Sequence, residues 1–319
     1  MAPLLGARLA ELGVEDECAR RWNRQRMVIW AENARRLKVA AEVIGALSAR
    51  SIATLALKGV ALAAAHYPHP GLRSMNDIDI LVKTQARARA FAVLEELGFG
   101  PSGPVLGASI DVLHALAFAR RGVEIDLHWR LLPECRDLES GPFWTNPDPI
   151  EIAGVRTVSL NRADMLFHVC VHGVRWDSAP LRWVADARVL AGRPGLDWNQ
   201  LVRRAIDLRL ELPVREALEL LGRFAFVDVP HEVRRSLSAH APSTFYKIEH
   251  QIRIRRPGLE GMVPRHMCLH MRRSEKGRVR TLIGLPGYLQ RAYGYGSAPE
   301  AASGLTRKLW RRLRPRAPR

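Results

Sequence analysis

Three classes of protein are excluded by what this 319-residue sequence lacks. No uninterrupted apolar run reaches the ~18 residues that a membrane span needs, and the nearest candidate, residues 51–67, is split by Lys58 and Gly59. The N-terminus has no basic region and soon turns acidic, which is unlike a secretory signal. The four cysteines lie far apart without a CxxC pair. We therefore expect free thiols and a cytoplasmic protein without a transmembrane segment.

Acidic residues are scarce in the C-terminal part of the chain. Residues 251–319 hold 17 Lys and Arg but only 3 Glu, out of 49 basic and 32 acidic residues in total. Arginine-rich coding would act on the whole chain, so it does not explain this local lack of acids. The region is expected to bind a polyanion such as RNA or tRNA, or an acidic membrane surface. The alternative for its end, residues 304–319, is a frayed and solvated tail.

The hydrophobic patterns predict alternating helices and strands, followed by helices alone. Apolar residues recur at helical spacing over residues 16–50, and strands are expected at 52–57, 77–82, 112–120 and 122–130. A turn at Arg121-Gly122 separates the last two strands, and Thr84 is the expected N-cap of a helix after the second. A short strand pair is expected near residues 150–160, and apolar stripes at helical spacing dominate from residue 161 onward.

We therefore expect an α+β fold, with a mixed sheet, flanking helices and a C-terminal helical bundle. The expected divisions are an N-terminal helical segment (1–50), an α/β domain (51–160), a helical domain (161–250) and a basic C-terminal region (251–319) with a partly disordered tail.

The stretch "RSMNDIDILV" (73–82) places two carboxylates in a strand that is otherwise apolar. Side chains alternate along a strand, so Asp77 and Asp79 share one face. Two adjacent like charges repel, and burial raises the cost. A cation between the two carboxylates would remove this penalty. A solvated polar face of the strand is the alternative.

Upstream of these acids, "LALKGVAL" reads as a strand, a glycine turn and the start of a helix. Such a turn offers backbone N–H groups to an anion. Lys58 stands beside Gly59 in this turn, and Arg73 precedes the two aspartates closely enough to reach a phosphate. These features predict a phosphate-binding turn next to the carboxylates.

A third acid is expected from "VEIDLHW" (123–129), in which Glu124, Asp126 and His128 share one strand face. Asp126 is the preferred third acid and Glu124 the alternative. Three carboxylates can hold two divalent ions that activate a hydroxyl, bridge a triphosphate and stabilise leaving pyrophosphate. The three motifs together predict metal-assisted phosphate chemistry.

In these motifs the chain resembles the DNA-polymerase-β-like nucleotidyltransferase superfamily. Over about residues 25–225, "LKGVAL", "RSMNDIDILV", "EIDLHW" and "LRWVADA" resemble a bacterial nucleotidyltransferase family. The resemblance implies that Gly59 takes the turn position, Asp77 and Asp79 form the metal-binding pair, and Asp126 is the third acid. It also implies a catalytic site with two Mg²⁺ ions that transfers a nucleoside monophosphate from an NTP to an acceptor. A small molecule, a peptide or RNA such as tRNA would be that acceptor.

One residue departs from the superfamily pattern. Val60 follows the glycine where the superfamily often has a serine that contacts the triphosphate. The backbone amide of Val60, helped by Lys58 or Arg73, would still bind phosphate. A degenerate, non-catalytic nucleic-acid-binding protein with this fold is the rival function, and the intact carboxylate set argues against it.

Two further motifs have alternative roles. His168 and His172 are four residues apart on one predicted helical face, which suits either a metal pair or simple packing; no glutamate or third ligand accompanies them. Asp186, inside "LRWVADARVL", suits either a structural pair with an arginine or substrate binding.

Overall fold

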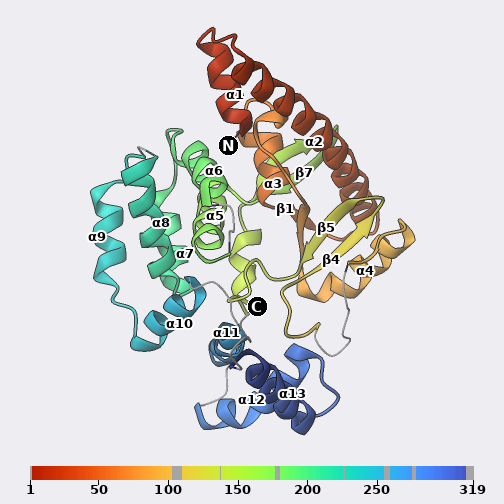
Figure 1. The fold of residues 1–319 in the computed structure, drawn as a ribbon, viewed down its shortest axis with the longest axis vertical. Coiled ribbons are helices and arrows are strands. Elements are labelled where there is room, and N and C mark those ends of the chain that lie inside the picture. Colours follow the sequence, from red (N-terminus) through yellow and green to blue (C-terminus); the bar gives the residue numbers. More distant parts are fainter. Residues whose placement is uncertain are drawn as a thin grey trace, which may run out of the picture.

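The computed structural model describes residues 2–102, 110–136, 138–176, 180–225, 227–254, 259–274 and 278–313. Its centre is a mixed seven-stranded sheet in the order β3-β4-β5-β2-β1-β7-β6 (Figure 1). The strands are β1 Thr54–Ala56, β2 Ile78–Val82, β3 Gly100–Pro101, β4 Ala115–Arg120, β5 Val123–His128, β6 Asp148–Ile152 and β7 Val155–Ser159. A mixed sheet with flanking helices confirms the predicted fold class.

Two tight hairpins form the outer parts of the sheet. The β4–β5 turn has Arg121 at φ 48° and Gly122 at φ 74°, and the β6–β7 turn has Ala153 at φ 47° and Gly154 at φ 87°. Two successive left-handed residues match the twist of the flanking strands. The predicted turn at Arg121-Gly122 and the predicted strand pair near residue 155 are both confirmed.

The central strands bring together the two acidic motifs of the sequence. Strand β2 is buried along its whole length and pairs in parallel with β5, so that Asp79 stands opposite Asp126. On its other side β2 pairs antiparallel with β1, and Leu57 N–H donates to the Asp79 carbonyl at 3.0 Å. The turn after β1 therefore lies beside Asp79 of β2.

Helices of the N-terminal part pack around this sheet. They are α1 Ala2–Glu11, α2 Glu17–Ala49, the short α3 Lys58–Ala61 and α4 Arg87–Glu96. Helix α2 confirms the helix predicted at residues 16–50, and the Asp16 side chain caps it by accepting from Ala19 N–H at 2.7 Å. The prediction of Thr84 as an N-cap is wrong. Ala86 precedes α4 instead, and the Thr84 hydroxyl donates to the Trp129 carbonyl at 3.0 Å.

The rest of the chain is helical, as the sequence predicted. The helices are α5 Arg162–Trp176, α6 Pro180–Ala191, α7 Trp198–Asp207, α8 Glu211–Phe224, α9 His231–Ala239, α10 Thr244–Ile254, α11 Leu259–Arg273, α12 Arg278–Tyr293 and α13 Ala298–Leu313. Figure 1 shows α5–α9 beside the sheet and α11–α13 grouped below them. Residues 314–319 of the predicted tail lie outside the described residues.

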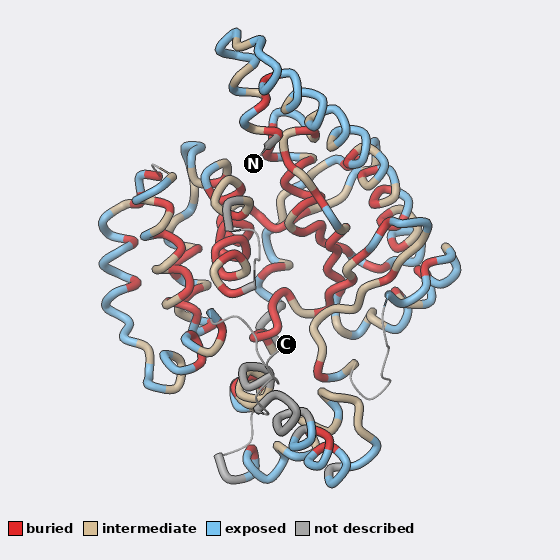
Figure 2. Tube along the Cα trace, viewed as in Figure 1, coloured by how far each residue is buried: buried red, intermediate tan, exposed pale blue. Residues whose placement is uncertain are grey.

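One apolar core joins the sheet to the first of these helices. It runs from Leu37 in α2 through β1, β2 and β5 to Leu237 in α9, and Figure 2 shows the buried trace concentrated along the sheet and α5. The division into domains at residues 160 and 250 stays a prediction. Within the described part of the chain, no helix is both long and apolar enough to cross a membrane.

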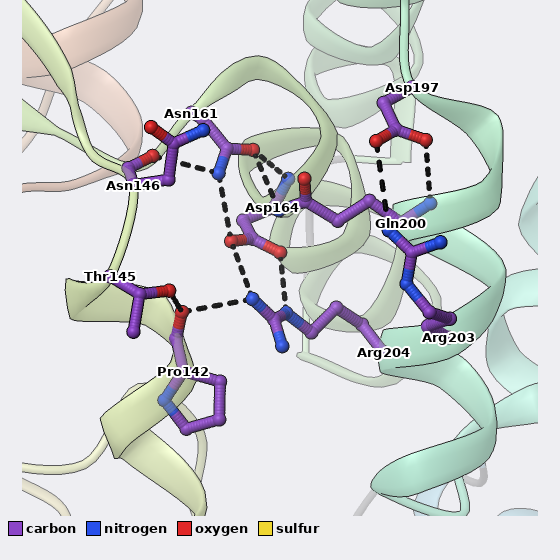
Figure 3. Close-up of polar contacts among 9 residues, drawn as sticks. All are labelled: Pro142, Thr145, Asn146, Asn161, Asp164, Asp197, Gln200, Arg203 and Arg204. Carbon is purple, nitrogen blue, oxygen red and sulfur yellow. Dashed lines mark hydrogen bonds and ion pairs between the residues drawn. The ribbon is translucent and has the colours of Figure 1, made fainter.

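A polar network fixes the start of α5 (Figure 3). Asn161 caps the helix by accepting from Asp164 N–H at 3.0 Å. The Arg204 guanidinium of α7 donates to the Asp164 carboxylate at 2.8 Å and to the Pro142 carbonyl at 2.9 Å. The network therefore ties α5 to α7 and to the 3₁₀ segment Leu138–Trp144. This anchoring matters because α5 and α6 form one wall of the cavity described next.

Candidate functional site

A cavity of about 170 Å³ lies between the central strands and helices α5 and α6. Its sheet side carries Asp77, Asp79 and Asp126, the three acids predicted from sequence. Its other lining residues come from the turn after β1, the segment before β2, and the two helices: Lys58, Gly59, Arg73, Met75, Asn76, Val169, His172, Arg182, Trp183 and Asp186. The structure thus brings the three separate motifs of the sequence to one place.

The carboxylates come from two neighbouring parallel strands, β2 and β5. Asp77 directly precedes β2, Asp79 lies within it with a side chain only 1% exposed, and Asp126 stands opposite on β5 with its side chain 32% exposed. Potential ligand atoms of Asp79, Asp126 and His128 all lie within 4.8 Å of one another. This is the one such metal-compatible group among the described residues.

The electrostatics of the cluster suit a cation. Burial raises the pKa of Asp77, and the negative charge of Asp79 raises it further. Burial alone would raise the pKa of Asp79 as well, but Lys58 and the hydrogen bond from His128 hold it well below its ordinary range. Carboxylate oxygens are the ligands that hard divalent ions prefer. The residues present therefore fit the divalent metal that the resemblance implies.

Lys58 already places a positive charge in the cluster. Its Nζ donates to Asp79 Oδ1 at 2.7 Å. Lys58 has a left-handed backbone with φ 37°, at the point where the chain leaves β1 and enters α3. A non-glycine residue in this region of φ costs about 1–2 kcal/mol. The surrounding structure therefore holds this residue in place against local strain.

His128 is a functional candidate that sequence reasoning had placed on the acidic face without a role. Its Nε2 lies 3.1 Å from Asp79 Oδ1 and 3.7 Å from Asp126 Oδ2. Its Nδ1 is buried and has no hydrogen-bond partner among the residues that the structure describes. Histidines that bind metals almost always donate their second ring N–H to a partner. The geometry therefore fits His128 as a donor that orients Asp79 better than as a metal ligand.

Arg73 lines the cavity, but its guanidinium is already bound. It forms two hydrogen bonds of 2.9 Å to the Asp186 carboxylate, which also accepts from the Tyr67 hydroxyl at 2.8 Å. The structural role considered for Asp186 is thereby confirmed. Because this buried pair joins the segment before β2 to helix α6, it fixes the width of the cavity. Because the pair uses Arg73 Nε and one N–H of Nη2, a phosphate contact from Arg73 would fall to its remaining donors.

The glycine turn is packed tightly against this pair. A Cβ at Gly59 would lie 2.7 Å from Arg73 Nη1 and 3.1 Å from Met75 Cγ. The next side chain, Val60, is fully buried in the core, so it can offer a nucleotide only its backbone amide. The first N–H groups of a helix have no partner within the helix. The geometry thus explains the glycine by close packing, and a phosphate-binding role for the turn stays a prediction.

Arg182 of α6 was not singled out from sequence, although it lies in the quoted motif "LRWVADA". It lines the cavity and has no hydrogen-bond or ion-pair partner among the residues that the structure describes. Unlike Arg73, whose charge is paired with Asp186, this arginine can offer its full charge to an anion. No signal in a single sequence distinguishes the two, because their difference depends on Asp186.

The remaining sequence candidates lie in different surroundings. Glu124 is exposed and accepts from the Ser102 hydroxyl at 2.9 Å, and it is not among the residues that line the cavity. His168 is fully buried, and its ring contacts that of His172 at 6.0 Å between centroids. Burial lowers the pKa of His172 to about 3 and that of His168 well below its ordinary value, so both are neutral.

Comparison with known proteins places this site in context. Residues 1–225 match the family described as "Uncharacterised nucleotidyltransferase". The chain belongs to this nucleotidyltransferase family. No curated protein matches the sequence.

Solved structures with low similarity to this chain include the following two. A solution structure of the antibiotic-resistance factor ANT(2″)-Ia is 13% identical, with a TM-score of 0.42 over 60% of this chain and 99% of that one. A crystal structure of an antigenic nucleotidyltransferase-like protein from Paracoccidioides brasiliensis is 14% identical, with a TM-score of 0.41 over 68% of this chain and 97% of that one.

Proposed function

We propose that this protein is a Mg²⁺-dependent enzyme that transfers a nucleoside monophosphate from an NTP to an acceptor and releases pyrophosphate. The observation that carries the proposal is the convergence of Asp77, Asp79 and Asp126 in one cavity of a nucleotidyltransferase-family chain. Asp77 and Asp79 would hold two Mg²⁺ ions, with Asp126 as the third ligand. When bound, these ions would polarise the α-phosphate and neutralise charge on the leaving pyrophosphate.

The side chains divide the transfer step between them. An acceptor oxygen forms a bond to the α-phosphorus while the bond from that phosphorus to the α,β-bridging oxygen breaks. Pyrophosphate leaves with the electron pair of the broken bond. Asp126 is the carboxylate that takes the proton of the acceptor hydroxyl. Its side chain is more exposed than that of Asp79, and Asp79 already accepts hydrogen bonds from Lys58 and His128.

The polyphosphate would lie against the cationic side of the cavity. Lys58, the amides of Gly59 and Val60, and Arg182 are the groups available to it. Arg73 would act mainly as a positioning residue, through its pair with Asp186. A direct contact between Arg73 and a phosphate is the alternative role for this residue in the same cavity.

The acceptor is proposed from charge rather than from the cavity. Residues 251–319 carry the excess positive charge, which supports an RNA acceptor such as a tRNA, acting in the cytoplasm. A small molecule or a peptide would instead leave this region without a role in the reaction.

The experiment that tests the proposal uses the full chain. The protein is incubated with each α-³²P-labelled NTP, Mg²⁺ and a cell extract, and the labelled products are treated with RNase or protease. Label transferred by the wild type and lost in Asp79→Asn supports the proposal. Sensitivity to RNase would identify an RNA acceptor, sensitivity to protease a peptide, and resistance to both a small molecule. Transfer at an equal rate by Asp79→Asn would overturn it.

A further inference from the structure

Three cationic side chains of described residues line the cavity, and each is held differently. Arg73 is bound to Asp186, and Arg182 has no partner among the described residues. Lys58 alone contacts one of the carboxylates assigned to the metal, with Nζ 2.7 Å from Asp79 Oδ1. The Lys58 ammonium therefore occupies part of the site proposed for the metal.

We propose that Lys58 is the resident counter-ion of the acidic site, which a divalent metal must displace before it can bind, and which then turns to the phosphates of the nucleotide. The inference rests on the proposed function, because it takes the three carboxylates as the metal site. It adds a regulation of that site: the protein's own cation competes with the metal.

The ammonium is stabilised by the whole cluster rather than by one ion pair. Asp77 and Asp126 line the same cavity as Lys58 and its partner Asp79. The Asp79 side chain is 1% exposed and that of Lys58 17% exposed, so water screens this attraction weakly. The Lys58 ammonium thus offsets the charge of acids that would otherwise repel one another.

The backbone around Lys58 fixes where its side chain begins. Leu57 N–H donates to the Asp79 carbonyl, which fixes the chain immediately before Lys58 beside β2. The left-handed φ of 37° at Lys58 follows at once. Strain at a non-glycine residue persists only where surrounding structure determines it, and it gathers at functional sites. The side chain itself is a flexible four-carbon stem, so its ammonium can move while the backbone stays in place.

Displacement follows from the geometry of Asp79 Oδ1. This oxygen already accepts from Lys58 and lies 3.1 Å from His128 Nε2. A metal bound there would stand next to the ammonium, and two positive charges at such a distance repel strongly in a partly buried site. Nucleotide phosphates would offer the ammonium a new partner. Metal and nucleotide binding should therefore favour one another.

The decisive measurement is the affinity for Mn²⁺ in the absence of nucleotide, determined from the electron paramagnetic resonance signal of the unbound ion. Lys58→Met removes the competing charge and should bind Mn²⁺ about tenfold more tightly than the wild type, within the usual range for coupled sites. Lys38→Met, on the exposed surface of α2, removes the same charge elsewhere and should match the wild type. Adding Asp79→Asn to Lys58→Met should abolish the gain.

The outcomes separate this inference from the proposed function. Equal Mn²⁺ affinity in the wild type and Lys58→Met, at a site that requires Asp79, would overturn the counter-ion role and leave the metal site intact. Absence of Asp79-dependent Mn²⁺ binding in both proteins would instead overturn the metal assignment itself.

Thermal unfolding gives a second readout if Lys58→Met is poorly stable. The variant leaves three acids without their cation, so its melting temperature should fall in EDTA and rise with Mn²⁺ by more than that of the wild type. An equal Mn²⁺ response in both proteins would count against the inference.

Discussion

The acidic cluster in the cavity and the arginine–glutamate cluster formed by helices α5, α10 and α11 with Glu134 both bury charge, but their acids have different partners. In the second cluster, Glu134 accepts from Arg175 at 2.7 Å and lies 3.7 Å from Arg253, while Glu249 pairs with Arg272 at 2.7 Å. All five side chains are at most 7% exposed. Each acid there has a guanidinium beside it.

The cavity cluster is instead short of cations. Three carboxylates share the ammonium of Lys58, and Asp126 is partly open to solvent. Burial raises the pKa of the acids in both clusters, but the neighbours differ: the arginines hold the pKa of Glu134 below its ordinary value, whereas the nearby Asp79 raises that of Asp77 further. A buried cluster in which every acid has an arginine partner holds the fold together, whereas a cavity cluster with more acids than bound cations is suited to an external cation. Substitutions in each cluster should therefore have opposite consequences.

The largest effect is expected from Asp77→Asn. It removes a proposed metal ligand and should slow transfer about 1000-fold, or about 4 kcal/mol. It also relieves repulsion from Asp79, so the melting temperature at neutral pH should stay unchanged or rise. Labelled-NMP transfer and thermal unfolding on the same preparation test both parts. Activity near that of the wild type would remove Asp77 from the site.

Glu134→Gln should show the reverse pattern. It leaves buried arginines without their carboxylate, which should cost about 3 kcal/mol of unfolding free energy, while NTP affinity below the melting temperature stays the same. Denaturant unfolding and calorimetric NTP titration measure the two quantities.

The pH dependence of stability gives an independent test of Glu134. Its folded-state pKa is depressed, so its contribution is present above the unfolded value of about 4.3 and is lost as pH falls toward the folded value. Acidification from pH 6 to pH 3 should therefore destabilise the wild type more than Glu134→Gln. Parallel losses in the two proteins would show that this carboxylate is not stabilised by its arginines.

Asp126→Asn and Glu124→Gln form a matched pair on one strand face. Asp126→Asn should slow transfer about 100-fold through loss of the general base, with a smaller effect on NTP binding. Glu124→Gln changes an exposed residue that contacts Ser102 and should leave the rate within about twofold, as expected of a surface substitution. Single-turnover kinetics distinguish the two. A large loss of transfer rate in Glu124→Gln but not in Asp126→Asn would mean that Glu124 is the third acid.

The smallest effect is expected from Arg182→Gln. Loss of one charge-assisted contact should weaken NTP binding about tenfold, in line with about 1.4 kcal/mol, and should barely affect binding of the free nucleoside. Arg188→Gln, an exposed substitution on the same helix, is the control. Equal affinity losses for NTP and nucleoside would mean that Arg182 supports the cavity wall instead of the phosphates.

Local patterns predicted much of this structure, because strand alternation and turn residues act over a few positions. They correctly gave β2, the β4–β5 hairpin at Arg121-Gly122 and the long helix α2. The Thr84 cap failed because a tertiary partner, the Trp129 carbonyl, took its hydroxyl. Propensity and pattern cannot foresee such competition from a distant residue.

The site was predictable in part for the same reason. Asp77, Asp79 and Asp126 carry their own signal in the alternation of their strands. The sequence carries no such signal for the pairing of Arg73, because its partner Asp186 lies 113 residues further along the chain. The availability of Arg182 and the contact between Lys58 and Asp79 likewise depend on how the strands and α6 come together, which no single sequence states.

The proposal that matters most is that Asp77, Asp79 and Asp126 bind a divalent cation. Its most direct test is anomalous diffraction from crystals of the full chain soaked with Mn²⁺ and a non-hydrolysable NTP analogue. We expect an anomalous peak among Asp77, Asp79 and Asp126, with the polyphosphate toward Lys58 and Arg182, and no such peak in Asp79→Asn crystals. Bound analogue without Mn²⁺ at these carboxylates, or Mn²⁺ at His168 and His172 instead, would contradict it.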